Sequence, residues 1–104
     1  MACYRLTRAA AEDLAGIFLD GLDRFGLAQA GKYHDGLEAA FAFLGEYPRA
    51  ARLRHEIDPP VRAHPYKAHL IIYDVEEDGI VILRVRHGRE DWQGNPEGVH
   101  QVPV

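Results

Sequence analysis

A short segment near the end of the chain combines side chains that can act on a phosphate group. Arg84 and Arg86 alternate along an expected strand, and His87 follows them, with carboxylates close behind. Strand alternation puts the two arginines on the face that carries Ile80 and Ile82, and the histidine on the other face. An imidazole or a carboxylate can serve as general acid or base, while guanidinium groups stabilise phosphate charge. The segment could therefore cleave a phosphodiester bond.

The same segment also has a purely structural interpretation. Arg84 and Asp91 could form an ion pair that supports the fold, and Trp92 could fill part of the core. Ionisable side chains gather in structural networks as well as in active sites. On residue types alone, the structural interpretation is favoured.

The sequence shows no pattern typical of a metal site or a cysteine nucleophile. Its six histidines have no paired spacing that suits a metal ion. The acidic segment 74–79 is similar to the start of a calcium loop, but Val85 stands at the twelfth position, where a bidentate glutamate is required. The single cysteine, Cys3, has no local cue for catalysis and permits no internal disulfide. We therefore expect no metal and no cofactor.

The charge of the chain is uneven along its length. Twelve Lys and Arg residues against 16 Asp and Glu give a formal net charge of -4, which excludes the basic footprint of a free nucleic-acid-binding protein. Residues 49–73 nevertheless carry five basic side chains and two acidic ones, a net charge of +3. A second basic island is the arginine cluster over residues 84–89. Such islands either meet an acidic partner or a phosphate, or belong to a mixed, solvated surface.

Length and hydropathy predict a single domain in the cytoplasm. A chain of 104 residues suits one domain with one modest core. Its longest apolar runs are far shorter than the roughly 20 residues of a membrane span. Its first residues do not resemble a secretory signal, and one cysteine agrees with a reducing compartment.

Two amphipathic helices are expected in the first half of the chain. Thr7 has the side-chain oxygen that suits a helix N-cap, and an apolar stripe with helical spacing follows it at Leu14, Ile17, Phe18, Leu22 and Phe25. We expect Gly26 to end this helix and a second helix to run on to Tyr47 and Pro48. The tight turn between them predicts an antiparallel helical hairpin, which must bury its apolar face against another element.

The second half of the chain is expected to supply a sheet. Residues 67–75 and 80–87 are β-branched runs separated by an Asp-Gly turn, which predicts a β-hairpin. Both faces of these strands are apolar, so both need cover. The helical hairpin can cover one face, which leaves the other for the C-terminal segment or for a partner.

Two shorter strands are expected before this hairpin. Residues 4–6 and 61–63 are each long enough for a small strand, and we expect His64 and Pro65 to turn the chain. Residues 49–60 lack a clean period and are read as a basic connecting loop. Together these elements predict an α+β domain.

Three stretches of the sequence carry patterns of a known family. The first is Ile-Leu-Arg-Val-x-His-Gly-Arg-x-Asp over residues 82–91. The second, Arg62-x3-Tyr66-x2-His69, precedes it in the chain. The third is Tyr-Arg-Leu-Thr over residues 4–7, followed by Glu-Asp-Leu over residues 12–14. In this order the patterns resemble the ParE branch of the RelE/ParE toxin superfamily, over residues 4 to about 92.

The resemblance implies a fold and a partner. The fold is a small α+β domain over residues 1–92, in which an N-terminal strand and an antiparallel helical hairpin pack on a mainly antiparallel β-sheet, with a C-terminal tail over residues 93–104. The partner is a ParD-like antitoxin, which contacts DNA through a ribbon-helix-helix domain and folds its C-terminal segment on the toxin in a hetero-oligomer. We expect that segment to cover apolar residues of the first helix and of the sheet, namely Leu14, Ile17, Phe18, Leu70, Ile72, Ile80 and Ile82.

The resemblance also implies two alternative activities. ParE-type toxins poison DNA gyrase, whereas RelE-type relatives cleave messenger RNA on the ribosome with a basic site on the sheet. Only Lys32 and Lys67 are lysines, so the lysine-rich RelE cluster is missing, which favours a non-enzymatic gyrase inhibitor. The expected target-binding residues are Arg62, Tyr66, Arg84, Arg86, His87, Arg89 and Trp92. The alternative, a ribosome-dependent mRNA endonuclease, would use His87 with Arg62, Arg84 and Arg89. A third hypothesis is a module that binds its partner without toxicity.

Overall fold

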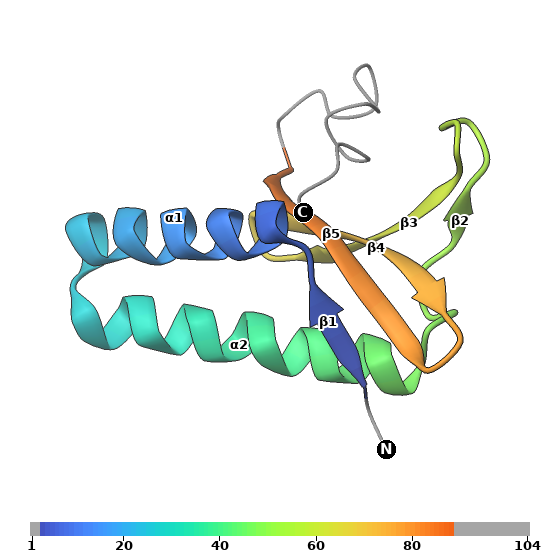
Figure 1. Ribbon diagram of the computed structural model, residues 1–104. Coiled ribbons are helices and arrows are strands. Elements are labelled where there is room, and N and C mark those ends of the chain that lie inside the picture. The colour runs from blue at the N-terminus through green and yellow to red at the C-terminus, as the bar shows by residue number, and fades with distance from the viewer. Residues whose placement is uncertain (1–2, 89–104) are drawn as a thin grey trace.

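The computed structural model describes residues 3–88, in which two helices lie against one face of a five-stranded sheet (Figure 1). The helices are α1 (Arg8–Phe25) and α2 (Leu27–Glu46), and the strands are β1 (Tyr4–Leu6), β2 (Leu53–Arg54), β3 (Val61–Tyr66), β4 (His69–Glu76) and β5 (Gly79–His87). The strand order is β1-β5-β4-β3-β2; β1 runs parallel to β5, and every other pair is antiparallel. The predicted α+β architecture is confirmed.

The ends of the helices follow from local chemistry. The Thr7 hydroxyl accepts a hydrogen bond from the Ala10 amide at 3.0 Å and donates one to the Leu83 carbonyl at 2.8 Å, so it caps α1 and ties it to β5. Gly26 joins the helices with φ +89°, a conformation that costs glycine little. The predicted helical hairpin is confirmed, and no helix in residues 3–88 is long and apolar enough to cross a membrane.

The core lies between the helical hairpin and the sheet. Its side chains come from both helices, from the loop after α2 and from β4 and β5: Ala10, Leu14, Leu37, Phe41, Leu44, Ala51, Ile71, Tyr73, Ile80, Ile82 and Val85. A second, smaller cluster packs on the opposite face of the sheet and consists of Ile57, Val61, Ala63 and Ile72. Both faces of the sheet are therefore packed, as expected from its two apolar faces.

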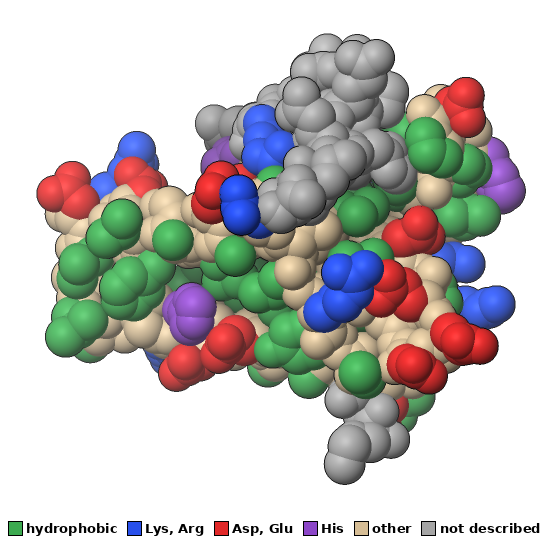
Figure 2. Space-filling view, in the orientation of Figure 1, with side chains coloured by type: hydrophobic (Ala, Val, Ile, Leu, Met, Phe, Trp, Pro, Cys, Tyr) green, Lys and Arg blue, Asp and Glu red, His purple; other side chains and the backbone are tan. Residues whose placement is uncertain are grey.

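The tip of the helical hairpin projects beyond the sheet, where the end of α1 meets the start of α2 (Figure 1). Leu19, Phe25 and Leu27 are each more than 60% exposed there, and Leu22 is 37% exposed. Figure 2 shows hydrophobic side chains gathered over this end of the molecule. We call these four leucine and phenylalanine residues the hairpin tip.

The third strand is longer than predicted. We expected a strand at residues 61–63 and a turn at His64 and Pro65, but β3 runs through both residues to Tyr66. Proline lacks an amide donor and is tolerated where a strand has no neighbour on that side. The short β2 pairs only with Val61 and Arg62, so it ends before Pro65 and leaves that side of β3 without a described strand.

A β-bulge changes the faces of β5. Ile72 of β4 pairs with Arg84 and the next residue, Tyr73, pairs with Ile82, so Leu83 is an extra residue. After the bulge, Val85 joins Ile82 in the helix-facing core. The prediction that Arg84 and Arg86 share a face with Ile80 and Ile82 is therefore wrong, because strict alternation fails at Leu83.

Candidate functional site

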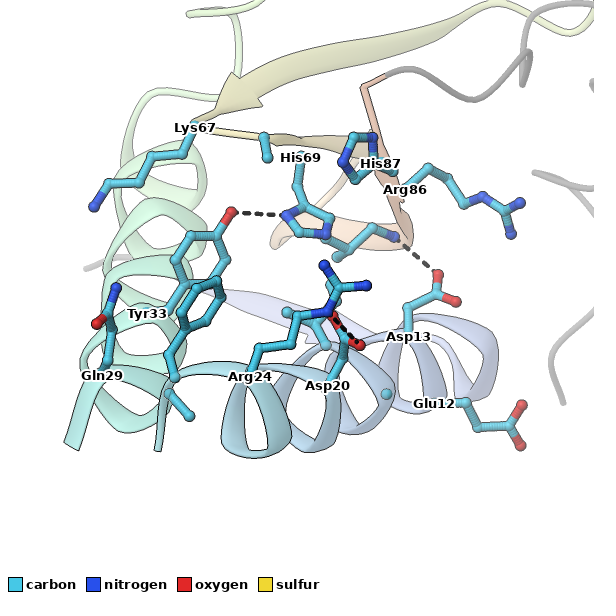
Figure 3. A pocket seen from close by; sticks show the side chains of 17 residues that line it. Glu12, Asp13, Asp20, Arg24, Gln29, Tyr33, Lys67, His69, Arg86 and His87 are labelled. Atoms are coloured by element: carbon cyan, nitrogen blue, oxygen red, sulfur yellow. Dashed lines mark hydrogen bonds and ion pairs between the residues drawn. The ribbon is translucent and has the colours of Figure 1, made fainter. Parts of the chain in front are cut away.

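A groove opens between the helical hairpin and the ends of β4 and β5 (Figure 3). Its volume is about 800 Å³. Its polar lining comes from α1, α2, the β3–β4 turn and the two strand ends: Glu12, Asp13, Asp20, Arg24, Gln29, Tyr33, Lys67, His69, Arg86 and His87. The acidic residues of this set lie on α1, whereas Lys67, Arg86 and both histidines lie on the sheet side.

The sheet side of the groove is a cluster of rings and one ammonium group. Tyr33 Oη lies 2.7 Å from His69 Nδ1. Burial raises the pKa of the Tyr33 hydroxyl, which therefore keeps its proton at neutral pH and can donate it to a neutral His69. The rings of His69 and His87 meet edge to face at 5.5 Å, and Lys67 Nζ lies 5.8 Å and 5.6 Å from the ring centroids of Tyr33 and Tyr66.

The backbone of Lys67 has an uncommon conformation. Its φ is +52°, in the left-handed region, although it carries a long side chain. The turn consists of Lys67 and Ala68 only, because Tyr66 already pairs with His69 across the two strands. This two-residue turn holds the Lys67 ammonium group over the two tyrosine rings.

Arg84 forms an ion pair within the chain. Its Nε and Nη2 atoms donate to the two carboxylate oxygens of Asp13 at 2.7 Å and 2.9 Å, and the Val85 amide donates to the same carboxylate at 3.0 Å. The two side chains are 16% and 15% exposed. Bidentate geometry with little exposure makes this a strong pair that fastens α1 to β5.

Arg62 also forms a hydrogen bond within the chain. Its Nη1 atom donates to the Ala51 carbonyl at 2.6 Å. Arg62 pairs across the sheet with Tyr73, and His87 pairs with His69, which lies four residues away on the same strand. Four residues of strand span about 13 Å. The described residues of the predicted phosphodiester-cleaving set are therefore spread over the sheet rather than brought together.

The remaining predicted target-binding residues lie in different environments. His87 and Arg86 line the groove, and Tyr66 packs edge to face on Tyr33 with 5.4 Å between ring centroids. Arg89 and Trp92 lie outside the described residues. The sequence contained no signal for the contact between Tyr33 and His69, because these residues are 36 positions apart.

The predicted antitoxin-binding set divides by burial. Leu14, Ile72, Ile80 and Ile82 are at most 5% exposed and belong to the core of the chain itself. In this fold a partner cannot reach them, which corrects the prediction for these four residues. Ile17, Phe18 and Leu70 are only half-buried and stay available. The exposed Leu19 and Leu27 of the hairpin tip lie off the apolar stripes from which the helices were recognised.

Comparison with known proteins identifies the family of this fold. A family model described as "ParE toxin of type II toxin-antitoxin system, parDE" matches residues 4–92. The chain is 30% identical to Toxin ParE3 of Caulobacter vibrioides over 83 residues, which cover 80% of this chain and 83% of that protein. It is 33% identical to Toxin ParE1 of Mycobacterium tuberculosis over 93 residues, which cover 88% of this chain and 95% of that protein.

A solved structure agrees with this assignment at the level of the fold. It is titled "Chromosomal ParDE TA system from P. aeruginosa", and its matching chain has a TM-score of 0.71 at 24% sequence identity. The match covers 84% of this chain and 96% of that chain. The small α+β domain described above thus has the same fold as that chain. The chain belongs to the ParE toxin family of type II toxin-antitoxin systems.

Proposed function

We propose that this ParE toxin acts on DNA gyrase, without enzymatic chemistry of its own, and that a ParD-like antitoxin neutralises it. The observation that carries the proposal is the match to the ParE family over residues 4–92. Gyrase acts on the chromosome, so the toxin would work in the cytoplasm.

Arg62 and Arg84 belong to the predicted nuclease set and lie in the described part of the chain. Their contacts favour a binding function over RNA cleavage. A ribonuclease needs cations that face the scissile phosphate and stabilise charge in the transition state. Arg84 instead neutralises Asp13 at 2.7 Å, and Arg62 donates to a backbone carbonyl at 2.6 Å. Redirecting either side chain toward RNA would leave a poorly exposed partner without its hydrogen bond.

The apolar surface of the helical hairpin supports the antitoxin part of the proposal. The hairpin tip and the half-buried Ile17 and Phe18 form an apolar surface beside the groove. An amphipathic segment that folds on binding recognises surfaces of this kind. In the proposed hetero-oligomer the antitoxin covers this surface and carries the ribbon-helix-helix domain, so DNA is contacted only through the antitoxin.

A ribosome-dependent mRNA endonuclease is the second candidate. The observation that favours it is the groove cluster, in which His87 lies beside His69 and lines the same groove as Lys67 and Arg86. An imidazole next to cations is a suitable general acid or base for phosphodiester cleavage.

Purified toxin added to gyrase supercoiling and cleavage assays tests the proposal. We expect micromolar toxin to inhibit supercoiling or to trap cleaved DNA, and we expect the purified antitoxin to reverse the effect. Gyrase that stays fully active would overturn the gyrase part. In parallel, transcripts are mapped after induction of the toxin and of His87→Ala: codon-phased cuts that this substitution abolishes would establish the endonuclease instead.

A further inference from the structure

The C-terminal end of α2 carries an aromatic pair that the core does not use. Phe43 and Tyr47 are 45% and 55% exposed, and their ring centroids are 5.3 Å apart. With the exposed Arg49 just after the helix, they border a shallow hollow of about 580 Å³. We call Phe43, Tyr47 and Arg49 the aromatic patch.

The loop that follows the aromatic patch is held rigidly, although it is not part of the sheet. The hydroxyl of Tyr73, a fully buried residue, donates to the Pro48 carbonyl at 2.7 Å and accepts from the Ala51 amide at 3.4 Å. Arg62 donates to the Ala51 carbonyl at 2.6 Å. Three hydrogen bonds from two strands therefore fix a loop of four residues. A surface that is already ordered loses little conformational entropy when it binds.

The charges around the aromatic patch define the chemistry of its partner. Arg49 makes no ion pair with any described residue, while Arg52 and Arg54 lie 3.8 Å and 3.7 Å from the same carboxylate oxygen of Glu56. The hollow itself is lined by one arginine and one glutamate, Arg49 and Glu46. This balance does not supply the phosphate neutralisation that holds a nucleic acid. Two exposed rings beside the Arg49 guanidinium suit a protein surface with an apolar side chain beside carboxylates.

We propose that the toxin binds gyrase through the aromatic patch. The matching face of gyrase presents an apolar side chain flanked by carboxylates. The inference rests on the proposed function and names the surface that performs it. Exposed aromatic rings and an arginine on a rigid support have the composition of an interaction hot spot.

The aromatic patch is separate from the surface proposed for the antitoxin. Leu27 begins α2 and Phe43 lies in its last turns, 16 residues on. At a rise of 1.5 Å per residue these positions are about 24 Å apart. The two surfaces therefore occupy opposite ends of one helix, and a substitution at one end leaves the other intact.

Two variants of the aromatic patch test the inference in the supercoiling assay. Phe43→Ala/Tyr47→Ala removes the rings and Arg49→Glu reverses the charge; each should raise the half-inhibitory toxin concentration at least about tenfold. The control is Arg8→Glu, an exposed charge reversal at the start of α1, which should inhibit like wild type. Because Arg49 and Arg8 are exposed, we expect unchanged circular dichroism and urea midpoints for the two charge reversals. The aromatic double variant also loses the contact of the Phe43 ring with His64, so its fold is checked by circular dichroism. If the aromatic double variant fails to fold, Arg49→Glu alone decides.

The outcomes separate this inference from the proposed function. If wild-type toxin does not inhibit gyrase, the proposed function fails, and the inference fails with it. If wild type inhibits and both patch variants inhibit equally well, only the inference is overturned. A wild-type dimer in sedimentation that both patch variants convert to monomer would also overturn it, because the patch would then serve self-association. Weaker inhibition with antitoxin binding retained is the expected result.

Discussion

The carboxylate of Asp13 connects α1 to β5 at the wall of the groove. One carboxylate accepts two hydrogen bonds from Arg84 and a third from the Val85 amide. The Val85 amide follows directly on the bulge at Leu83, so Asp13 satisfies a donor where the strand ladder is disturbed. The same carboxylate thus fixes both the helix and the irregular part of β5.

Removing this charge should destabilise the protein strongly. Asp13→Asn keeps the shape of the side chain but removes the negative charge from the poorly exposed pair with Arg84. We expect the free energy of unfolding to fall by about 2–4 kcal/mol, as measured by urea denaturation.

An exposed pair of the same residue types provides the control. Arg24 and Asp20 lie 3.2 Å apart on α1, but their side chains are 66% and 63% exposed. Asp20→Asn should therefore cost less than about 0.5 kcal/mol. Equal losses in the two variants would show that burial does not determine the strength of the Asp13 pair.

His64 should make the stability of the protein depend on pH. Burial lowers the pKa of its imidazole from the ordinary 6.5. As the pH falls through 6.5, the unfolded chain takes up a proton that folded His64 does not, so the free energy of unfolding decreases until the folded pKa is reached. We expect His64→Gln to lose less stability than wild type between pH 7.5 and 5.5 in urea denaturation. Parallel curves for the two proteins would refute this assignment.

At the level of elements, the turn between β4 and β5 is built around one glycine. Gly79 has φ +148°, and a Cβ atom there would collide with the Cys3 carbonyl. That carbonyl accepts a hydrogen bond from the Ile80 amide at 3.2 Å, where the chain before β1 meets β5. The glycine therefore permits both the turn and the approach of the N-terminal strand.

Gly79→Ala should separate β1 from the sheet. We expect a loss of about 2–4 kcal/mol in the free energy of unfolding, because the backbone is strained and the Cys3 carbonyl must move. Gly31→Ala in α2 is the matched control: its new Cβ meets nothing within 4 Å, and alanine is the better helix former by about 1 kcal/mol. The prediction is wrong if both substitutions stabilise the protein.

The sequence predicted those elements whose signals are local. Thr7, Gly26 and the apolar stripes defined both helices to within a residue or two, and the Asp-Gly turn placed the β-hairpin. The full length of β3 could not be predicted, because Pro65 is tolerated only where no strand follows on its open side. The bulge at Leu83 had no sequence signal, so the residues after it were placed on the wrong face relative to Ile80 and Ile82.

At the scale of the whole molecule, the sequence predicted only some features of the candidate site. Alternation placed His87 and Val85 on one face, and their partners His69 and Ile71 agree with that. The expected pair of Arg84 with Asp91 involves a residue outside the described part of the chain. The pair of Arg84 with Asp13 was not predicted, because Asp13 lies 71 positions away and is brought close by the packing of α1 on β5. Contacts of such separation are set by tertiary structure, and a single sequence does not show them.

The pairing of β1 with β5 joins the first strand to the last strand of the described chain, which has a consequence during translation. About 40 residues separate the end of α2 from the end of β5, so a ribosome adding 5–20 residues per second needs roughly 2–8 s to pass from one to the other. During that interval Leu14 and Phe41 have no sheet to cover them, and Tyr73 has not yet fastened the loop after α2. The newly made chain therefore emerges as a helical hairpin without its sheet, and its apolar face stays uncovered until β5 is complete.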